Sequence, residues 1–264
     1  MPNPIITLTT DYGTNSHLAG TLRGVILNIN PEATIVDITH HVTPYDLLDG
    51  ALAIGSAYRY FPPRTIHMVV VDPGVGTQRR PLLVSASQQY FLAPDNGVLS
   101  TLFEKEAGVT VRHITAGHYF LSPLSNTFHG RDIFAPAAAW LSKTWQTASF
   151  GEEITDYVRF ALPQPKASGD TLNGVVLRVD TFGNLMTNFT LENLTPAVIN
   201  SGKIRLTIGS KEIQKFAQAY SQGAAGEPFA ILGSSGFVEI AVNMGNAARL
   251  LGAQRGAEVS LALP

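Results

Sequence analysis

The sequence contains no cysteine among its 264 residues, so disulfides, thiolate zinc sites and cysteine nucleophiles are excluded. No run of Lys and Arg exceeds two residues and the net charge is −2, which gives no reason to expect a nucleic-acid partner. No apolar run reaches the roughly 18 residues of a membrane-spanning helix, and the first residues lack the features of a signal peptide. We therefore expect a cytoplasmic protein without a membrane partner.

Several standard ligand motifs are also missing. No Gly-Lys-Ser/Thr follows a glycine run, so the chain has no phosphate-binding P-loop. The GVG at 74–76 lacks the third glycine of a dinucleotide fingerprint, because Arg79 stands in its place. There is no Gly-x-Ser-x-Gly elbow, and His40 and His41, as neighbours on an extended chain, would point in opposite directions. We expect neither a metal nor a cofactor.

The first part of the chain shows strands that alternate with helices. Apolar strands are predicted at 5–9, 34–38 and 65–71, and a helix is predicted to start at Thr43–Pro44, where a cap hydroxyl precedes proline. An apolar helix follows at 133–145. Such alternation is typical of a mostly parallel sheet flanked by helices. We assign residues 1–162 to an α/β domain.

The pattern changes beyond residue 162. Residues 163–170 are rich in Pro, Ser and Gly without periodicity, which indicates a linker. From 171 to 264 the pattern is mainly of strands, with a short helix near 246–251. The sequence therefore predicts a second, smaller all-β domain over residues 171–264.

One stretch of the first domain has the features of a site. Three valines at 69–71 predict a buried strand, which Asp72 and a glycine loop end abruptly before Arg79. In open α/β sheets, ligands bind at the carboxyl ends of strands. The alternative is a structural turn in which Asp72 caps its own loop. Asp11 also follows a predicted strand, and His129 lies in a polar loop, so these groups could converge at one edge.

The second domain offers two glycine-containing stretches, at 180–188 and 232–239, each with a phenylalanine. An aromatic face beside Asn and Ser would suit a purine, which stacks and presents acceptor nitrogens. The alternative is a pair of hairpin turns with core phenylalanines. The residues alone leave both open.

Taken in order, the motifs resemble a known family. They are TTDYG at 9–13, VTPYD at 42–46, VDPGVGT at 71–77, APDNG at 93–97, TFHGRD at 127–132, FGN at 182–184, and SSG at 234–236 followed by Asn243. This set is similar to the S-adenosylmethionine hydroxide adenosyltransferases, hydrolases related to fluorinase and chlorinase. The resemblance covers nearly the whole chain and both domains.

The resemblance implies a fold, an assembly and a reaction. It implies an α/β domain followed by a β-barrel-like domain, and a homotrimer in which each active site lies between the first domain of one subunit and the second domain of a neighbour. It also implies that water attacks C5′ of the ribose of S-adenosyl-L-methionine and releases adenosine and L-methionine.

The family's catalytic Asp, Arg and His fall on Asp72, Arg79 and His129. In the halogenases a Tyr stands in place of Asp72, and a Ser in place of Gly130 belongs to the halide pocket. A carboxylate would repel a halide and could accept a proton from water, so Asp72 favours water as the nucleophile. Arg79 would hold Asp72 in a charge-assisted pair. Whether Asp72 or His129 takes the proton is left open.

Six further residues match positions that contact the substrate in the resembling enzymes. The resemblance implies the following contacts: Asp11 (ribose hydroxyls), Tyr45 (beside the ribose), Phe182 and Asn184 (adenine), and Asp180 and Ser234 (methionine). Two alternatives remain at this stage. One is a halogenase of the same fold, and the other is a protein that binds S-adenosylmethionine or adenosine without catalysis.

Overall fold

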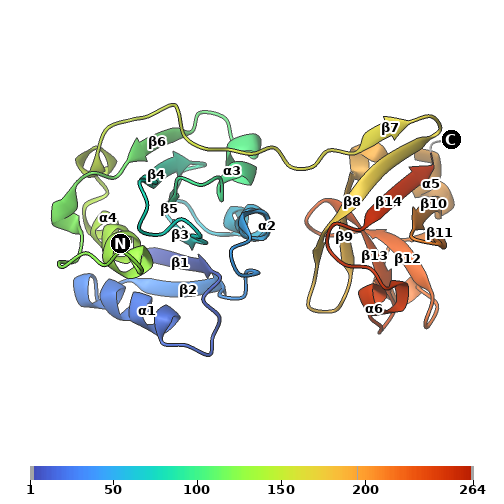
Figure 1. Ribbon diagram of the computed structural model, residues 1–264, viewed down its shortest axis with the longest axis horizontal. Helices are drawn as coiled ribbons and strands as arrows, with labels where there is room; N and C mark the ends of the chain where they lie inside the picture. The colour runs from blue at the N-terminus through green and yellow to red at the C-terminus, as the bar shows by residue number, and fades with distance from the viewer. Residues whose placement is uncertain (1–2, 195, 263–264) are drawn as a thin grey trace. The chain divides into compact units, whose positions relative to one another are not determined.

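The computed structural model describes residues 3–194 and 196–262, apart from the side chains of 197 and 198. Contacts within the chain divide it into two compact units, Met1–Phe160 and Ala161–Pro264. A sheet with flanking helices forms the first unit, and strands make up most of the second (Figure 1). The predicted fold class, a mostly parallel α/β domain followed by a barrel-like β domain, is confirmed.

The first unit is built on a six-stranded sheet in the order β2-β1-β3-β5-β4-β6. The strands are β1 (Ile5–Thr10), β2 (Thr34–Thr39), β3 (Ile66–Val70), β4 (Pro81–Ala86), β5 (Gln89–Pro94) and β6 (Thr110–His113). β2, β1, β3 and β5 run parallel, whereas β4 pairs antiparallel with β5 and β6. The β-branched, fully buried β3 at the centre fits the pattern of a parallel sheet covered on both faces.

Helices cover both faces of this sheet. They are α1 (Leu18–Ile29), α2 (Leu47–Ala57), α3 (Ser100–Lys105) and α4 (Ala135–Thr144). Met68 and Val70 of β3 belong to the core that includes α1 and α4, while Val69 and Val71 belong to the core that includes α2 and α3. This alternation follows from the two-residue period of a strand. Among the described residues, no helix is long and apolar enough to cross a membrane.

Short helical turns connect the helices and strands of both units. They are η1 (Tyr58–Tyr60), η2 (Gly117–Tyr119), the π-turn η3 (Gly130–Phe134), η4 (Thr147–Phe150), η5 (Leu191–Asn193) and η6 (Tyr220–Gln222). The turn η3 occupies the start of the helix predicted at 133–145, so the regular helix α4 begins only at Ala135.

The prediction that a helix begins at Thr43–Pro44 was wrong. The helix α2 begins at Leu47, and Asp46 caps it by accepting a hydrogen bond from the Asp49 N–H at 3.0 Å. Tyr45 has a φ of +66°, which lies in the left-handed region and cannot continue into a right-handed helix. An aspartate cap three residues later therefore replaces the threonine cap.

The second unit is a closed barrel. Its strands follow the order β14-β10-β11-β12-β13-β9-β8, and pairing of β14 with β8 closes the ring. They are β8 (Thr171–Val179), β9 (Leu185–Thr190), β10 (Lys203–Ile208), β11 (Lys211–Ala217), β12 (Pro228–Leu232), β13 (Phe237–Val242) and β14 (Glu258–Ala262). The pairs are antiparallel except β11 with β12. Closure leaves no free edge in the ring.

Three further elements accompany the barrel. The strand β7 (Lys166–Ser168) lies within the segment expected to be a linker and pairs with β8. The helix α6 (Ala247–Leu251) matches the short helix expected near 246–251, whereas α5 (Pro196–Ser201) was not predicted. The barrel interior is filled by the side chains of one apolar cluster.

Candidate active site

Two acidic residues follow the ends of the neighbouring strands β1 and β3, where the order of the strands changes direction across the first sheet. β1 lies between β2 and β3, and Thr10 at the end of β1 is in register with Val70 at the end of β3. Asp11 follows β1 directly, and Asp72 follows β3 after one residue. Burial is the main reason that the pKa of Asp11 lies above its usual value, and the charge of Asp72 raises it further. Ligands bind at such a switch point in open α/β sheets.

Asp72 forms a closed ion pair with Arg79. Arg79 Nε donates to both carboxylate oxygens, at 2.7 Å to Oδ1 and 2.8 Å to Oδ2, and Nη2 also donates to Oδ2. The side chains of Asp72 and Arg79 are 5% and 8% exposed. Because a charge-assisted fork of this kind fixes both partners, the position of the carboxylate is set by the arginine.

The neighbouring Arg80 has a different role. Its Nε donates to Asp95 at 2.8 Å, and its Nη1 donates to Asp156 at 2.8 Å. These bonds tie the loop after β3 to the end of β5 and to the segment near 156. Of the two adjacent arginines, only Arg79 bonds to Asp72.

A close approach of two loops brings His129 to this ion pair. Gly76 has a φ of +80°, and a Cβ there would collide with the carbonyl oxygen of Asn126. The loop that carries His129 is itself held by Asp132, whose Oδ2 accepts a hydrogen bond from the Ser125 N–H at 2.8 Å. Glycine is needed at 76 both for the left-handed backbone and for the contact.

His129 completes the cluster and is buried, at 6% exposure. Its Nδ1 lies 2.8 Å from Arg79 Nη2. A guanidinium nitrogen can only donate, so Nδ1 accepts and the neutral ring carries its proton on Nε2. Burial, followed by the charge of Arg79, lowers the pKa of His129, which favours this neutral form.

The other ring nitrogen of His129 is buried and makes no hydrogen bond of normal length and angle in the described part of the chain, although a backbone interaction with Ser125 acts to raise the pKa of the ring. A buried donor without an acceptor costs about 1–3 kcal/mol. Proteins retain such groups where a ligand completes the hydrogen bond. The Nε2–H of His129 is therefore a donor suited to a bound oxygen atom, and the predicted group of Asp72, Arg79 and His129 is brought together by the fold.

Asp11 and Tyr45 also lie together. Asp11 Oδ2 accepts a hydrogen bond from the Tyr45 N–H at 2.9 Å, so the left-handed turn at Tyr45 serves the carboxylate of Asp11. The Tyr45 side chain is 73% exposed. An exposed aromatic ring beside a half-buried carboxylate could stack on a ligand that the carboxylate binds.

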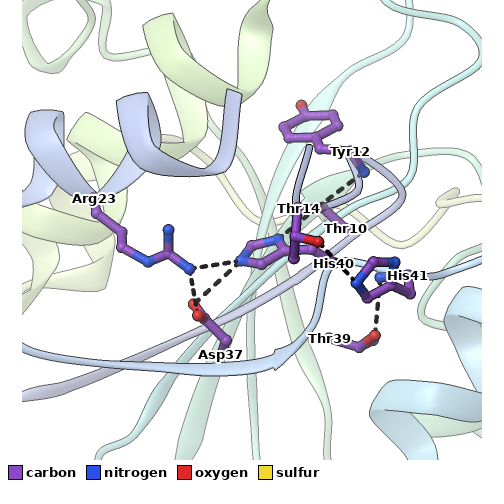
Figure 2. Close-up of polar contacts among 8 residues, drawn as sticks. All are labelled: Thr10, Tyr12, Thr14, Arg23, Asp37, Thr39, His40 and His41. Carbon is purple, nitrogen blue, oxygen red and sulfur yellow. Dashed lines mark hydrogen bonds and ion pairs between the residues drawn. The ribbon is translucent and has the colours of Figure 1, made fainter. Parts of the chain in front are cut away.

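A buried histidine holds the turn that carries Asp11. His40 Nδ1 lies 2.8 Å from Thr10 Oγ1, which also accepts a hydrogen bond from the Tyr12 N–H at 3.2 Å. The carbonyl of His40 accepts from the Gly13 N–H at 2.7 Å. Figure 2 shows the side-chain part of this arrangement. His40 therefore holds the turn through both its side chain and its carbonyl group. The sequence did not reveal this role.

The far side of His40 meets a charged pair. His40 Nε2 lies 3.2 Å from Asp37 and 3.1 Å from Arg23, which also pairs with Asp37 (Figure 2). Burial is the largest cause of the lowered pKa of His40, and Asp37 opposes it. The neighbouring His41 contacts Thr14 at 3.3 Å in the same view and is less tightly held.

The second unit brings three of its four predicted residues together. Asp180 Oδ1 accepts hydrogen bonds from the N–H groups of Phe182 and Asn184 at 2.9 and 2.8 Å, and Oδ2 accepts from Asn184 Nδ2 at 2.8 Å. Asp180 therefore organises this loop. The loop leaves Phe182 74% exposed. The next residue, Gly183, has a φ of +85° and lies against Asn246.

Ser234 lies in the turn between β12 and β13 and is exposed. Among the described residues, it forms no hydrogen bond with Asp180, Phe182 or Asn184. A residue that the sequence did not single out lies beside the turn that carries Ser234. Glu239 is buried, accepts a hydrogen bond from Tyr220 at 2.9 Å, and packs against Gly233. Burial first, and then the charge of Asp180, raise the pKa of Glu239.

Residues 3–194 and 196–262 contain no group of three His, Asp or Glu side chains that could hold a metal ion. The expectation that no cofactor is needed remains a prediction. The first unit offers a carboxylate, a guanidinium and an imidazole N–H at the edge of its sheet, and each unit separately exposes an aromatic ring, Tyr45 in the first and Phe182 in the second.

Comparisons with known proteins agree with the resemblance found in the sequence. The profile of the SAM hydroxide adenosyltransferase N-terminal domain matches residues 6–151, and that of the C-terminal domain matches residues 174–260. A protein of Salinispora tropica named (R)-S-adenosyl-L-methionine hydrolase is 35% identical over 260 residues, which cover 97% of this chain and 96% of that protein.

Two further comparisons bound this similarity. A fluorinase of an Actinoplanes strain is 29% identical over 275 residues, with 91% of each chain covered. The crystal structure of an uncharacterized conserved protein from Thermotoga maritima has a TM-score of 0.89 and 37% identity, over 97% of this chain and 99% of that one. Nearly the full length of the chain is thus matched in sequence and in fold.

Proposed function

Because the chain belongs to the SAM hydroxide adenosyltransferase family, we propose that it hydrolyses S-adenosyl-L-methionine to adenosine and L-methionine. The substrate we propose is the epimer with R configuration at the sulfonium, the one in the name of the Salinispora relative. The observation that carries this proposal is the cluster of Asp72, Arg79 and His129, in which a buried Nε2–H lacks a hydrogen-bond acceptor among the residues that the structure describes.

The reaction we propose is a single in-line displacement. The oxygen of a water molecule bonds to C5′ of the ribose as the C5′–S bond breaks, and the bonding electrons leave with sulfur as the neutral thioether of methionine. The positive charge on sulfur vanishes during this step, so a dry pocket disfavours the substrate more than the transition state. Alignment of one water with the C5′–S bond supplies much of the rate.

The geometry gives Asp72 and His129 different tasks in this proposal. His129 already carries a proton on Nε2, so it donates a hydrogen bond to the attacking oxygen and orients it. Asp72 then takes the proton. Water is a very weak acid, but its O–H protons become strongly acidic as the oxygen bonds to C5′ and gains positive charge, so transfer late in the step suits a carboxylate. Arg79 bonds to both residues and keeps their spacing.

The remaining predicted residues would bind the substrate. Asp11 would accept hydrogen bonds from the ribose hydroxyls, with the ring of Tyr45 beside the sugar. In the second unit, Phe182 and Asn184 would contact adenine. Asp180 and Ser234 are proposed for the methionine end, and Asp180 would act partly through the loop that it organises.

We further propose a homotrimer in which each site combines the first domain of one subunit with the second domain of a neighbour. Two ligand loops support this, because they expose aromatic rings, Tyr45 at 73% and Phe182 at 74%. Mixing the inactive variants Asp72→Asn and Asn184→Ala after joint refolding should restore activity that neither has alone. No recovery, or a monomer by light scattering, would refute the shared site.

The test of the reaction uses the purified protein with (R)- and (S)-S-adenosyl-L-methionine separately, in buffers with and without chloride or fluoride. We expect adenosine and methionine from the R epimer at a rate that halide does not change. A 5′-halo-adenosine would instead identify a halogenase. Tight binding by calorimetry without any product would identify a binding protein.

A further inference from the structure

Tyr12 occupies a position between the two loops that carry the proposed catalytic groups. It directly follows Asp11 on the turn after β1. Its ring meets Phe128 edge to face, with 5.8 Å between centroids. Its hydroxyl reaches Gly130, so Tyr12 contacts both neighbours of His129 in the chain.

The contact at Gly130 explains why this residue is a glycine. Gly130 begins the π-turn η3 and is not among the residues with positive φ, so its backbone is open to any residue. The space around it is not open, since a Cβ there would collide with Tyr12 Oη and would lie 3.4 Å from Leu22 Cδ2. The leucine end is flexible, whereas the tyrosine is fixed. The volume beside Gly130 therefore belongs to the hydroxyl of Tyr12.

The backbone of Tyr12 is held as firmly as its ring. Its N–H donates to Thr10 Oγ1 at 3.2 Å, and that oxygen contacts the buried His40 at 2.8 Å (Figure 2). Burial, and after it the charges of Asp11 and Asp72, raise the pKa of Tyr12, so the phenol is neutral at ordinary pH. A rigid, uncharged side chain can hold a neighbouring loop without disturbing the ion pair.

We propose that Tyr12 is a positioning residue for the hydrolysis, which packs against Phe128 and Gly130 and thereby aims the Nε2–H of His129 at the attacking oxygen. This inference rests on the proposed function. It concerns the orientation of His129 and not the binding of the ribose, which falls to Asp11. A change at the contact should accordingly lower kcat and leave KM nearly unchanged.

The test is a double-variant cycle with Tyr12→Phe and Gly130→Ala. Gly130→Ala alone should lower kcat about 100-fold, because the added methyl group displaces the tyrosine or the His129 loop by a distance of atomic size. Tyr12→Phe keeps the ring and should lower kcat less than tenfold. In the double variant the methyl group faces ring carbon Cζ at 3.4 Å in place of the hydroxyl, so kcat should return to within tenfold of Tyr12→Phe.

Gly20→Ala is the matched control, because Gly20 lies in helix α1 with nothing within 4 Å of an added Cβ. It should leave kcat and KM unchanged. If Gly130→Ala keeps full kcat, or if the double variant is no better than Gly130→Ala, the inference is wrong.

A second readout separates this inference from the proposed function. In nitrogen-15 spectra of the imidazoles, wild type and the double variant should show His129 protonated at Nε2, while Gly130→Ala should shift that signal. A protein that shows this pattern but does not hydrolyse either epimer would refute the proposed function and retain only the claim that Tyr12 orients the ring of His129. Unshifted signals in Gly130→Ala would refute the role of Tyr12 even in an active enzyme.

Discussion

Two histidines of the first unit are both buried, and their surroundings differ in one respect. His67 lies in the middle of β3 at 0% exposure, with Nδ1 2.7 Å from Thr7 Oγ1 and Nε2 3.2 Å from Gln89 Oε1. Its ring stacks on Phe91 at 4.8 Å. His129 has one nitrogen on Arg79 and one buried nitrogen that makes no hydrogen bond of normal length and angle in the described chain.

This difference separates a structural histidine from one poised for chemistry. Both nitrogens of the His67 ring form hydrogen bonds inside the core. These bonds replace the hydrogen bonds to water that the ring loses when it is buried. His129 retains an unused donor at a sheet edge, which lowers stability and which we propose serves a bound ligand. Burial alone would not distinguish them. The two histidines are distinguished by how many of their ring nitrogens form a hydrogen bond.

The largest effect is expected for His129→Asn. Loss of the Nε2–H should lower kcat about 100- to 1000-fold, the usual effect of removing one oriented donor from an active site. Thermal unfolding should change little or shift upward, since the unpaired donor disappears. Steady-state kinetics and calorimetry on the same sample check both parts. A variant with normal kcat would show that His129 is merely structural.

The converse change is His67→Leu. It leaves the hydroxyl of Thr7 and the side-chain oxygen of Gln89 without the histidine that they contact, and should lower the free energy of unfolding by about 2–4 kcal/mol. The folded fraction should keep its kcat, because His67 is not one of the proposed site residues. Urea unfolding measures the first quantity. A loss of kcat at temperatures where the variant is fully folded would contradict the separation drawn between the two histidines.

His67 should also make stability depend on pH. Burial lowers its pKa to about 4 from the usual 6.5, so in mild acid the unfolded chain binds a proton that the folded chain does not. Stability is therefore full above pH 6.5 and falls as the pH drops toward 4, by roughly 3 kcal/mol. In His67→Leu, the free energy of unfolding should depend less on pH between 6.5 and 4. An equally steep fall in the variant would assign the effect to other groups.

A smaller effect is expected at Asp11, which contributes binding and no chemistry in this account. Asp11→Asn should raise KM about tenfold, as for one hydrogen bond to a charged group, with kcat within a few-fold of wild type. The contrast with His129→Asn is the point of the measurement. A fall in kcat as large as that of His129→Asn would place Asp11 in the chemical step.

The smallest expected effect is that of a chelator. The described residues hold no cluster suited to a metal ion, and the mechanism routes no step through one. Incubation with EDTA followed by gel filtration should leave kcat unchanged. Activity that is lost and then restored by a divalent cation would require a different mechanism.

The features that the sequence could predict are those fixed by local periodicity. The valines at 69–71 indicate a buried strand, and parallel strands end at one edge, so Asp11 and Asp72 were expected to lie close together. The charge of Asp72 acting on Asp11 agrees with that expectation. The order of motifs identified the family, which the profiles confirm for residues 6–151 and 174–260.

Other features depend on contacts between residues far apart in the chain. Nothing local distinguishes Arg79 from Arg80, and the choice is made by Asp95 and Asp156, which bind Arg80. The strand β7 forms where a linker was expected, because pairing with β8, and not its own pattern, fixes it. The contact of Tyr12 with Gly130 joins two loops that no sequence period relates.

Isotope labelling tests the central claim most directly, that water held at Asp72 and His129 attacks C5′. The protein is incubated with (R)-S-adenosyl-L-methionine in water enriched in oxygen-18, and the masses of the products are measured by mass spectrometry. The account predicts one labelled oxygen in adenosine, at the 5′ position, and none in methionine. Adenosine without label, or a product other than adenosine, would contradict it.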